Sequence, residues 1–308
     1  MTSWKLSTAV LVLACSFPMT AGASYTRIVS FGDSLSDTGN VFAATGSPPA
    51  PYYQGHYSNG PIWLEILATR LGLPAPTPSL LGGNDNAWGG AETTLTGNSI
   101  QGTPNIGTQI AGYLAGHTLT GQDLITVWGG GNDFLFGGQT NPAVSVNNLG
   151  AEITTLALAG GKTFLVPNLP LLGQVPGTAG LPQAQRDGLD QLTQGFNALL
   201  AAKTAALRAS LGVTIYQGDV ASLFANAKAN PSAYGFTNTT TGAFNDKVYT
   251  GAGYLFWDDE HGTTAANRLV ANVAFAAVPE PSSVVLLGLA GLALLAPGVR
   301  AWKRERAA

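Results

Sequence analysis

The feature that most constrains the fold is an alternation of two kinds of segment between residues 25 and 277. Short β-branched and apolar runs predict buried strands at 26–31, 123–128, 163–167 and 213–217. Longer segments with helical periodicity lie between and around them, at 61–71, 106–115, 144–159, 182–210 and 263–275. Alternation of strands and helices favours a parallel sheet with helices on both faces. We therefore expect an α/β fold, a three-layer α/β/α sandwich with a mainly parallel central sheet.

Composition indicates one domain, covering residues 24–277, without an internal linker or repeat. Hydrophobic residues make up 45% of the chain, enough for a sizeable core. Residues 24–278 carry nine Lys and Arg against 15 Asp and Glu, a net charge of −6, with no basic cluster. We therefore expect no nucleic-acid partner. The single cysteine, Cys15, excludes an internal disulfide and a multi-cysteine metal site, and we expect no metal and no cofactor.

The N-terminal residues 1–23 have the layout of a secretory signal peptide. Lys5 supplies a positive charge, residues 9–15 are apolar, and Ala21-Gly22-Ala23 forms a cleavage site for signal peptidase. Two alternatives remain open, a first buried helix and a lipoprotein acylated at Cys15.

The C-terminal residues 278–308 combine three features. Pro279-Glu280-Pro281 precedes an apolar run at 284–299, and a basic cluster follows it. The run is close to the shortest that spans a bilayer, and the basic cluster should stay on the cytoplasmic side. This layout resembles the PEP-CTERM sorting signal of Gram-negative bacteria. The resemblance implies transient anchoring in the inner membrane, recognition by an exosortase and removal of the tail. The alternative is a plain C-terminal membrane anchor.

Two polar residues follow predicted strands, where an open parallel sheet places its ligands. Ser34 follows the first strand, and Asn132 follows the strand that ends at Trp128. A serine nucleophile needs a base within hydrogen-bond reach, an acid to orient the base, and donors aimed at the oxyanion.

The search for that base covers only three histidines. His56 lies in a loop rich in Gly, Tyr and Pro, and His117 lies at the polar end of a predicted helix; neither has an acid nearby in the sequence. His261 has Asp258 three residues upstream, and a turn there can fold the carboxylate back onto the imidazole. The pattern therefore predicts His261 as the base and Asp258 as the acid.

Four segments in order resemble the sequence blocks of the GDSL family, also called SGNH hydrolases. Residues 31–40 (Phe-Gly-Asp-Ser-Leu-Ser-Asp-Thr-Gly-Asn) match the first block closely, and residues 86–91, 129–133 and 258–261 are similar to the second, third and fifth. Residues 53–60 also resemble a segment common in bacterial members. Two positions depart from the family pattern: Trp88 replaces a smaller residue, and Gly262 stands where a proline often follows the histidine.

The resemblance implies a flavodoxin-like SGNH fold and a role for each matching residue. Ser34 would be the nucleophile, with His261 and Asp258 completing the catalytic triad. The oxyanion hole would combine the backbone N–H groups of Ser34 and Gly89 with the side chain of Asn132.

These observations predict an exported serine hydrolase that cleaves carboxylic esters of small molecules or lipids, an esterase or lipase. We expect signal peptidase and exosortase as processing partners, and a location first at the inner membrane and then at the cell surface or outside the cell. Two alternatives stay open: a carbohydrate O-acetylesterase acting on exopolysaccharide, and a non-catalytic surface or matrix protein on the same fold. The Gly-x-Ser-x-Gly elbow of α/β-hydrolases and the His-Glu-x-x-His metal motif are both absent from the sequence.

Overall fold

The computed structural model describes residues 25–278 of the 308-residue chain. The predicted signal peptide at 1–23 and the apolar run at 284–299 lie outside the described residues. Within residues 25–278, no helix is both long enough and apolar enough to cross a membrane.

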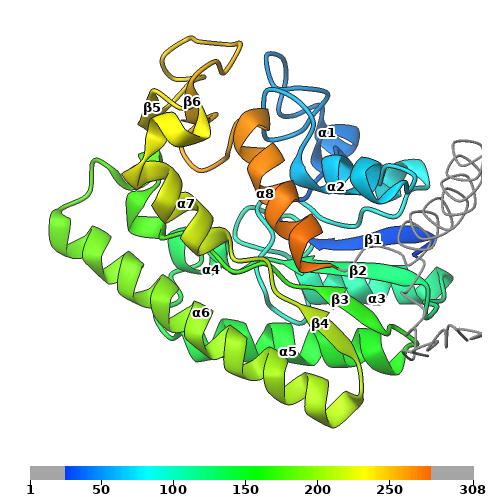
Figure 1. Cartoon of the computed structure of the whole chain (residues 1–308). Coiled ribbons are helices and arrows are strands. Elements are labelled where there is room, and N and C mark those ends of the chain that lie inside the picture. Colours follow the sequence, from blue (N-terminus) through cyan, green and yellow to red (C-terminus); the bar gives the residue numbers. More distant parts are fainter. Residues whose placement is uncertain (1–24, 279–308) are drawn as a thin grey trace, which may run out of the picture. The chain divides into compact units, whose positions relative to one another are not determined.

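A parallel sheet forms the centre of the fold (Figure 1). Its strands stand in the order β1-β2-β3-β4, with all neighbours parallel. They span Arg27–Gly32 (β1), Asp123–Trp128 (β2), Thr163–Leu165 (β3) and Thr214–Tyr216 (β4). Every residue of β2 is buried, as expected for a strand covered on both faces. The four predicted strands are therefore confirmed, with β3 and β4 shorter than the sequence suggests.

Residues 84–88 extend the sheet beyond β1. Ser30 N–H donates to the carbonyl of Asn84 at 3.0 Å, and Asn86 N–H donates to the carbonyl of Ser30 at 2.8 Å. Ser30 and Asp85 form a parallel bridge. The segment occupies the position of an edge strand, which gives the order 84–88, β1, β2, β3, β4. This is the flavodoxin-like strand order, in which ligands bind where the connections diverge on either side of the first strand.

Helices cover both faces of the sheet. In Figure 1, α2 and α8 lie together above it, and α5 and α6 lie below it. The helices span Asn40–Thr45 (α1), Trp63–Leu71 (α2), Ile106–Gly116 (α3), Gly131–Leu135 (α4), Pro142–Leu158 (α5), Gln183–Leu211 (α6), Val220–Ala229 (α7) and Thr264–Ala277 (α8). Phe31, Trp63, Phe164 and Phe196 are fully buried in the core between the layers. The predicted three-layer α/β/α architecture is confirmed.

The five predicted helices are present, and their ends follow local chemistry. α2 and α6 stop at Gly72 and Gly212, which both take the left-handed conformation that commonly ends a helix. α8 begins at a Thr263 side chain that accepts a hydrogen bond from Ala266 N–H.

Several short elements escape sequence analysis. They are the helices α1, α4 and α7, the 3-10 turns Ser79–Leu81, Leu172–Gln174, Pro176–Thr178 and Pro231–Tyr234, and a two-stranded sheet of β5 (Asn238–Gly242) and β6 (Tyr254–Phe256). α1 and α4 have only six and five residues, too few to show a helical period.

Candidate active site

Ser34 sits in a tight turn directly after β1. Ser36 N–H and Asp37 N–H both donate to the carbonyl of Asp33, at 3.0 and 3.1 Å, and Leu35 N–H donates to the Asp33 carboxylate at 3.0 Å. The N–H of Ser34 makes no hydrogen bond to another group within residues 25–278. The turn therefore places Ser34 beside a cavity at the carboxyl end of the sheet.

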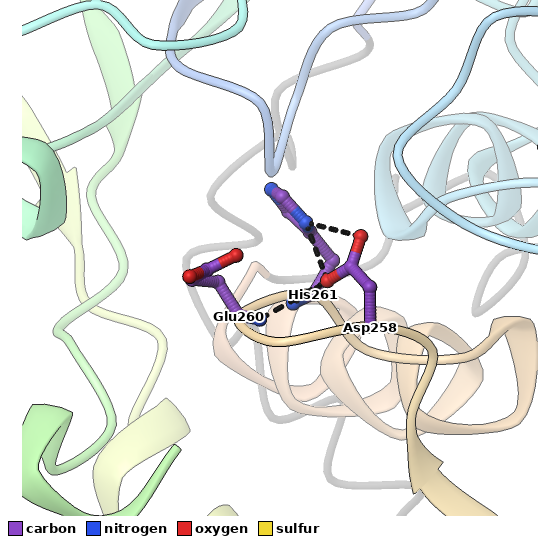
Figure 2. Close-up of side chains that lie close together, drawn as sticks. All are labelled: Asp258, Glu260 and His261. Carbon is purple, nitrogen blue, oxygen red and sulfur yellow. Dashed lines mark hydrogen bonds and ion pairs between the residues drawn. The ribbon is translucent and has the colours of Figure 1, made fainter. Parts of the chain in front are cut away.

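His261 reaches Ser34 from the loop between β6 and α8. Its Nε2 lies 2.7 Å from Ser34 Oγ, and its Nδ1 lies 2.8 and 2.9 Å from the two carboxylate oxygens of Asp258. Asp258 Oδ1 also accepts the N–H groups of Glu260, at 3.0 Å, and of His261, at 2.8 Å (Figure 2). The turn that the Asp-x-x-His spacing predicts is thus present, and it brings the three residues into one hydrogen-bonded chain.

The charges around His261 favour its role as a base with a charged partner. Burial alone would lower the pKa of His261, but Asp258, followed by Glu260 and Asp33, raises it above its ordinary value of 6.5. Burial acts to raise the pKa of Asp258, yet His261 and the backbone N–H donors bring it below its ordinary value. Asp258 is therefore ionised at neutral pH and faces the imidazole of His261.

The other two histidines have partners of their own. His56 Nδ1 lies 2.8 Å from the carbonyl of Tyr53, and its Nε2 lies 3.1 Å from Glu65 Oε2. His117 stacks on Tyr113, with ring centroids 4.7 Å apart. Of the three histidines, only His261 contacts Ser34.

Asn132, the side-chain donor that the sequence predicts, also lies beside this cavity. It sits in α4 and lines the same cavity as Ser34. Its amide nitrogen donates one hydrogen to the carbonyl of Ala91 at 2.9 Å, which leaves the second hydrogen for another acceptor. The adjacent Asp133 fixes α4 in place, because its carboxylate accepts Thr93 N–H at 3.0 Å and the Ser145 hydroxyl at 2.7 Å.

The sequence prediction for Gly89 needs correction. Gly89 N–H donates to Asp37 Oδ2 at 2.9 Å, so this N–H is not available to an oxyanion. The next residue, Gly90, lines the cavity, and its N–H makes no hydrogen bond within residues 25–278. Gly90 has φ +82°, a conformation that favours glycine. The geometry therefore makes Gly90 the available backbone donor and gives Gly89 a structural role.

Asp37 is the residue that holds this part of the site together, and the sequence analysis missed it. Its carboxylate accepts Gly39 N–H at 2.7 Å, together with the N–H groups of Asn40 and Val41 at the start of α1. The same carboxylate accepts Gly89 N–H. It therefore ties the turn after Ser34 to the loop that carries Gly90. Asp37 stands two residues before Gly39, the N-cap of α1, so the local sequence does not mark it as a helix cap.

The cavity beside Ser34 has a volume of about 310 Å³. Its polar lining includes Ser34, Asn132 and His261, and Gly90 also borders it. Much of the remaining wall is apolar and comes from α4, the segment 169–175 and α7: Leu135, Phe136, Leu169, Pro170, Leu172, Val175, Val220 and Phe224. The volume lies at the lower end of the range for pockets that bind small organic ligands.

One group of side chains at the site could also contact a metal ion. Asp258, Glu260 and His261 can each bring one ligand atom within 4.8 Å of the others. However, His261 already uses Nδ1 toward Asp258 and Nε2 toward Ser34. In Figure 2 the Asp258 carboxylate faces His261, whereas the Glu260 carboxylate turns away from Asp258. A metal bound by all three would have to break the hydrogen-bonded chain, so the residues present fit proton transfer better than metal binding.

A Ser–His–Asp chain at the carboxyl end of a parallel sheet is the arrangement of an α/β serine hydrolase. The sequence model of the GDSL-like Lipase/Acylhydrolase family matches residues 28–274. The chain belongs to this family, whose members are carboxylic ester hydrolases.

Three individual proteins show the range of the similarity. The chain is 30% identical over 233 residues to phosphatidylcholine-sterol acyltransferase of Aeromonas hydrophila, covering 72% of this chain and 66% of that protein. It is 29% identical over 271 residues to thermolabile hemolysin of Vibrio parahaemolyticus, covering 80% and 62% respectively. It thus spans two thirds or less of the length of these two relatives. The native aryl esterase of M. smegmatis aligns with a TM-score of 0.48 at 18% identity, covering 82% of this chain and 97% of that one.

Proposed function

We propose that the chain is an exported serine esterase or lipase that cleaves carboxylic esters through an acyl-enzyme on Ser34. The observation that carries the proposal is the hydrogen-bonded chain from Ser34 Oγ through His261 to Asp258. Ser34 Oγ lies 2.7 Å from His261 Nε2. A scaffold without catalytic function would have no need to keep a nucleophile, a base and an ionised acid in line beside a cavity.

The reaction follows from the positions of these groups. His261 Nε2 takes the proton of Ser34 as its oxygen attacks the ester carbonyl, and Asp258 stabilises the resulting imidazolium. The oxyanion accepts hydrogen bonds from Ser34 N–H, Gly90 N–H and the second amide hydrogen of Asn132. The tetrahedral intermediate then expels the alcohol, which takes the proton from His261. Water, activated by His261, attacks the acyl-enzyme by the same route and releases the acid.

The walls of the cavity support an apolar acyl group. Leu135, Leu172, Val220 and Phe224 belong to its apolar lining, and a methylene group buried there contributes about 0.8 kcal/mol. An acetyl group would leave most of a 310 Å³ cavity unfilled. This favours a medium-chain acyl ester over an O-acetylated carbohydrate. The name of the Aeromonas hydrophila relative, phosphatidylcholine-sterol acyltransferase, is compatible with acyl chemistry on lipid esters.

The test uses the full-length chain and a panel of p-nitrophenyl esters from acetate to palmitate, with acetyl-xylan beside it. The parent should prefer a medium-chain ester, and Ser34→Ala should lose hydrolysis while keeping the same urea unfolding transition. Ser36→Ala, two residues along the same turn, is the matched control and should keep its activity. Activity retained in Ser34→Ala would contradict the mechanism, and a clear preference for acetyl-xylan would contradict the proposed substrate.

We propose that the two ends of the chain direct its export. Residues 1–23 would be removed by signal peptidase. The segment 278–308, with its predicted span at 284–299, would anchor the protein in the inner membrane until an exosortase removes it. Mass spectrometry of the protein secreted by a Gram-negative host with an exosortase should find an N-terminus at Ser24 and no residues from 284–299. A protein that keeps residues 1–23 in the cytoplasm would contradict export.

A further inference from the structure

Tyr52 makes a direct hydrogen bond to the acid of the triad. Its hydroxyl donates to Asp258 Oδ2 at 2.9 Å, across 206 positions of sequence. Tyr52 lies in the loop between α1 and α2, whereas Asp258 lies between β6 and α8. This oxygen of Asp258 otherwise faces His261 Nδ1, at 2.9 Å. Tyr52 is therefore the protein's one side-chain donor to Asp258 besides the catalytic base within residues 25–278.

The loop that carries Tyr52 makes three further contacts with His261 and the residues that follow it. The ring of Tyr57 lies against the imidazole of His261, with centroids 4.9 Å apart. The Ser58 hydroxyl donates to the carbonyl of Gly262 at 2.9 Å, and Asn59 Oδ1 accepts Thr264 N–H at 2.9 Å. Four residues of the loop therefore support the acid–base pair: Tyr52, Tyr57, Ser58 and Asn59. Of these, Tyr52 contacts the carboxylate itself.

The surroundings of Tyr52 fix both its ring and its protonation. The ring packs edge-on against Trp257, with centroids 5.7 Å apart, and lies tilted against Phe244, with centroids 5.2 Å apart. Burial, followed by the charge of Asp258, raises the pKa of Tyr52 well above its ordinary value. The phenol therefore keeps its proton, and it can only donate to Asp258.

We propose that Tyr52 is a positioning residue that sets the orientation of Asp258 and the basicity of His261, an inference that rests on the proposed function of the site. The hydrogen bond prevents rotation of the carboxylate away from His261 Nδ1. It also draws negative charge from Asp258 toward the phenol, so Asp258 attracts the protonated imidazole less strongly. Without the hydroxyl, the imidazolium form of His261 becomes more stable.

The other ionisable groups around the pair stay in place when the hydroxyl is removed. Glu260 and Asp33 also raise the pKa of His261, and the ring of His261 contacts that of Tyr57. Glu260 and Asp259 also raise the pKa of Tyr52. A shift in the pH profile of a variant that lacks only the Tyr52 hydroxyl therefore reports the hydrogen bond to Asp258.

The experiment compares Tyr52→Phe with the parent and with Tyr53→Phe, all as full-length chains. Tyr53 is the adjacent tyrosine, and its ring lies beside His56, with ring centroids 5.5 Å apart, whereas the contact with Asp258 comes from Tyr52. Initial rates on p-nitrophenyl butyrate between pH 5 and 9 give the profile of kcat/KM against pH. The acid limb of this profile is its rise on the acidic side. Urea unfolding checks the fold.

Tyr52→Phe should lower kcat/KM about tenfold, the rate equivalent of one hydrogen bond, mainly through kcat. Its acid limb should move upward by about half a pH unit, because His261 then needs a higher pH to become neutral. Tyr53→Phe should match the parent in both respects. A Tyr52→Phe profile identical to the parent's, or a limb that moves downward, would overturn the proposal. If Ser34→Ala proves active, the proposed function fails instead, whatever Tyr52→Phe does.

Discussion

Replacing Phe224 with alanine should lengthen the acyl chain that the cavity accepts. Phe224 lies on α7 and lines the catalytic cavity together with Val175 and Pro170. The same three residues also line a second, much smaller cavity of about 10 Å³, whose lining includes Phe256 as well. The rings of Phe224 and Phe256 lie 5.8 Å apart. Phe224 therefore borders both spaces.

The magnitude follows from the space that the ring occupies. The second cavity is too small to add much volume, so the gain comes mainly from the ring itself, which fills the space of roughly four methylene groups. Each methylene that enters it contributes about 0.8 kcal/mol, or about a fourfold increase in kcat/KM. Two methylenes would therefore raise kcat/KM about 15-fold relative to the shorter ester.

The assay measures kcat/KM for p-nitrophenyl esters of increasing chain length with the parent, Phe224→Ala and Leu223→Ala. Leu223 lies on the same helix but packs against the main core and does not line the cavity, so it controls for damage to α7. The acyl chain length that gives the highest kcat/KM should increase by roughly two to four carbons in Phe224→Ala. It should not change in Leu223→Ala. Because a Phe to Ala change in a partly buried site can cost about 3 kcal/mol of stability, Phe224→Leu serves as a milder variant with a smaller shift. An unchanged optimum in both Phe224 variants would refute the assignment of this end of the cavity to the acyl chain.

Three further outcomes test the oxyanion site and the proton transfer. Asn132→Ala should lower kcat by about 100- to 1000-fold with little change in KM, because the lost donor acts on the transition state; steady-state kinetics with equal losses in KM would argue against this role. Activity of the parent should rise with pH as His261 loses its proton, with a midpoint above 6.5 because Asp258, Glu260 and Asp33 raise its pKa. Glu260→Gln removes one of these negative charges, so its midpoint should lie lower than the parent's, the direction opposite to that of Tyr52→Phe. A profile that stays flat from pH 5 to 9 would exclude a histidine base.

The sequence pattern does not predict three of the helices. They are α1, α4 and α7, at residues 40–45, 131–135 and 220–229. α4 begins with Gly131, Asn132 and Asp133, residues of weak helical propensity, and is held by the contacts of Asp133 with Thr93 and Ser145. Such a helix forms because of its tertiary contacts, which no local pattern records.

The strands of the central sheet and the three members of the proposed triad were accessible from the sequence alone. A buried parallel strand must be an apolar run, and the end of the first such run places Ser34 at the ligand-binding edge of the sheet. With three histidines in the chain, the spacing of Asp258 and His261 left one well-supported base, and a local turn is enough to join the two.

Tertiary structure alone decided which groups complete the site around Ser34. Asp37 takes the N–H of Gly89 and leaves that of Gly90, and two adjacent glycines give no sequence signal for which N–H is free. Tyr52 reaches Asp258 across 206 positions. The apolar walls of the cavity come from α4, α7 and the segment between β3 and α6. Local residue patterns fix hydrogen bonds within a turn, whereas these contacts depend on how separate elements pack against one another.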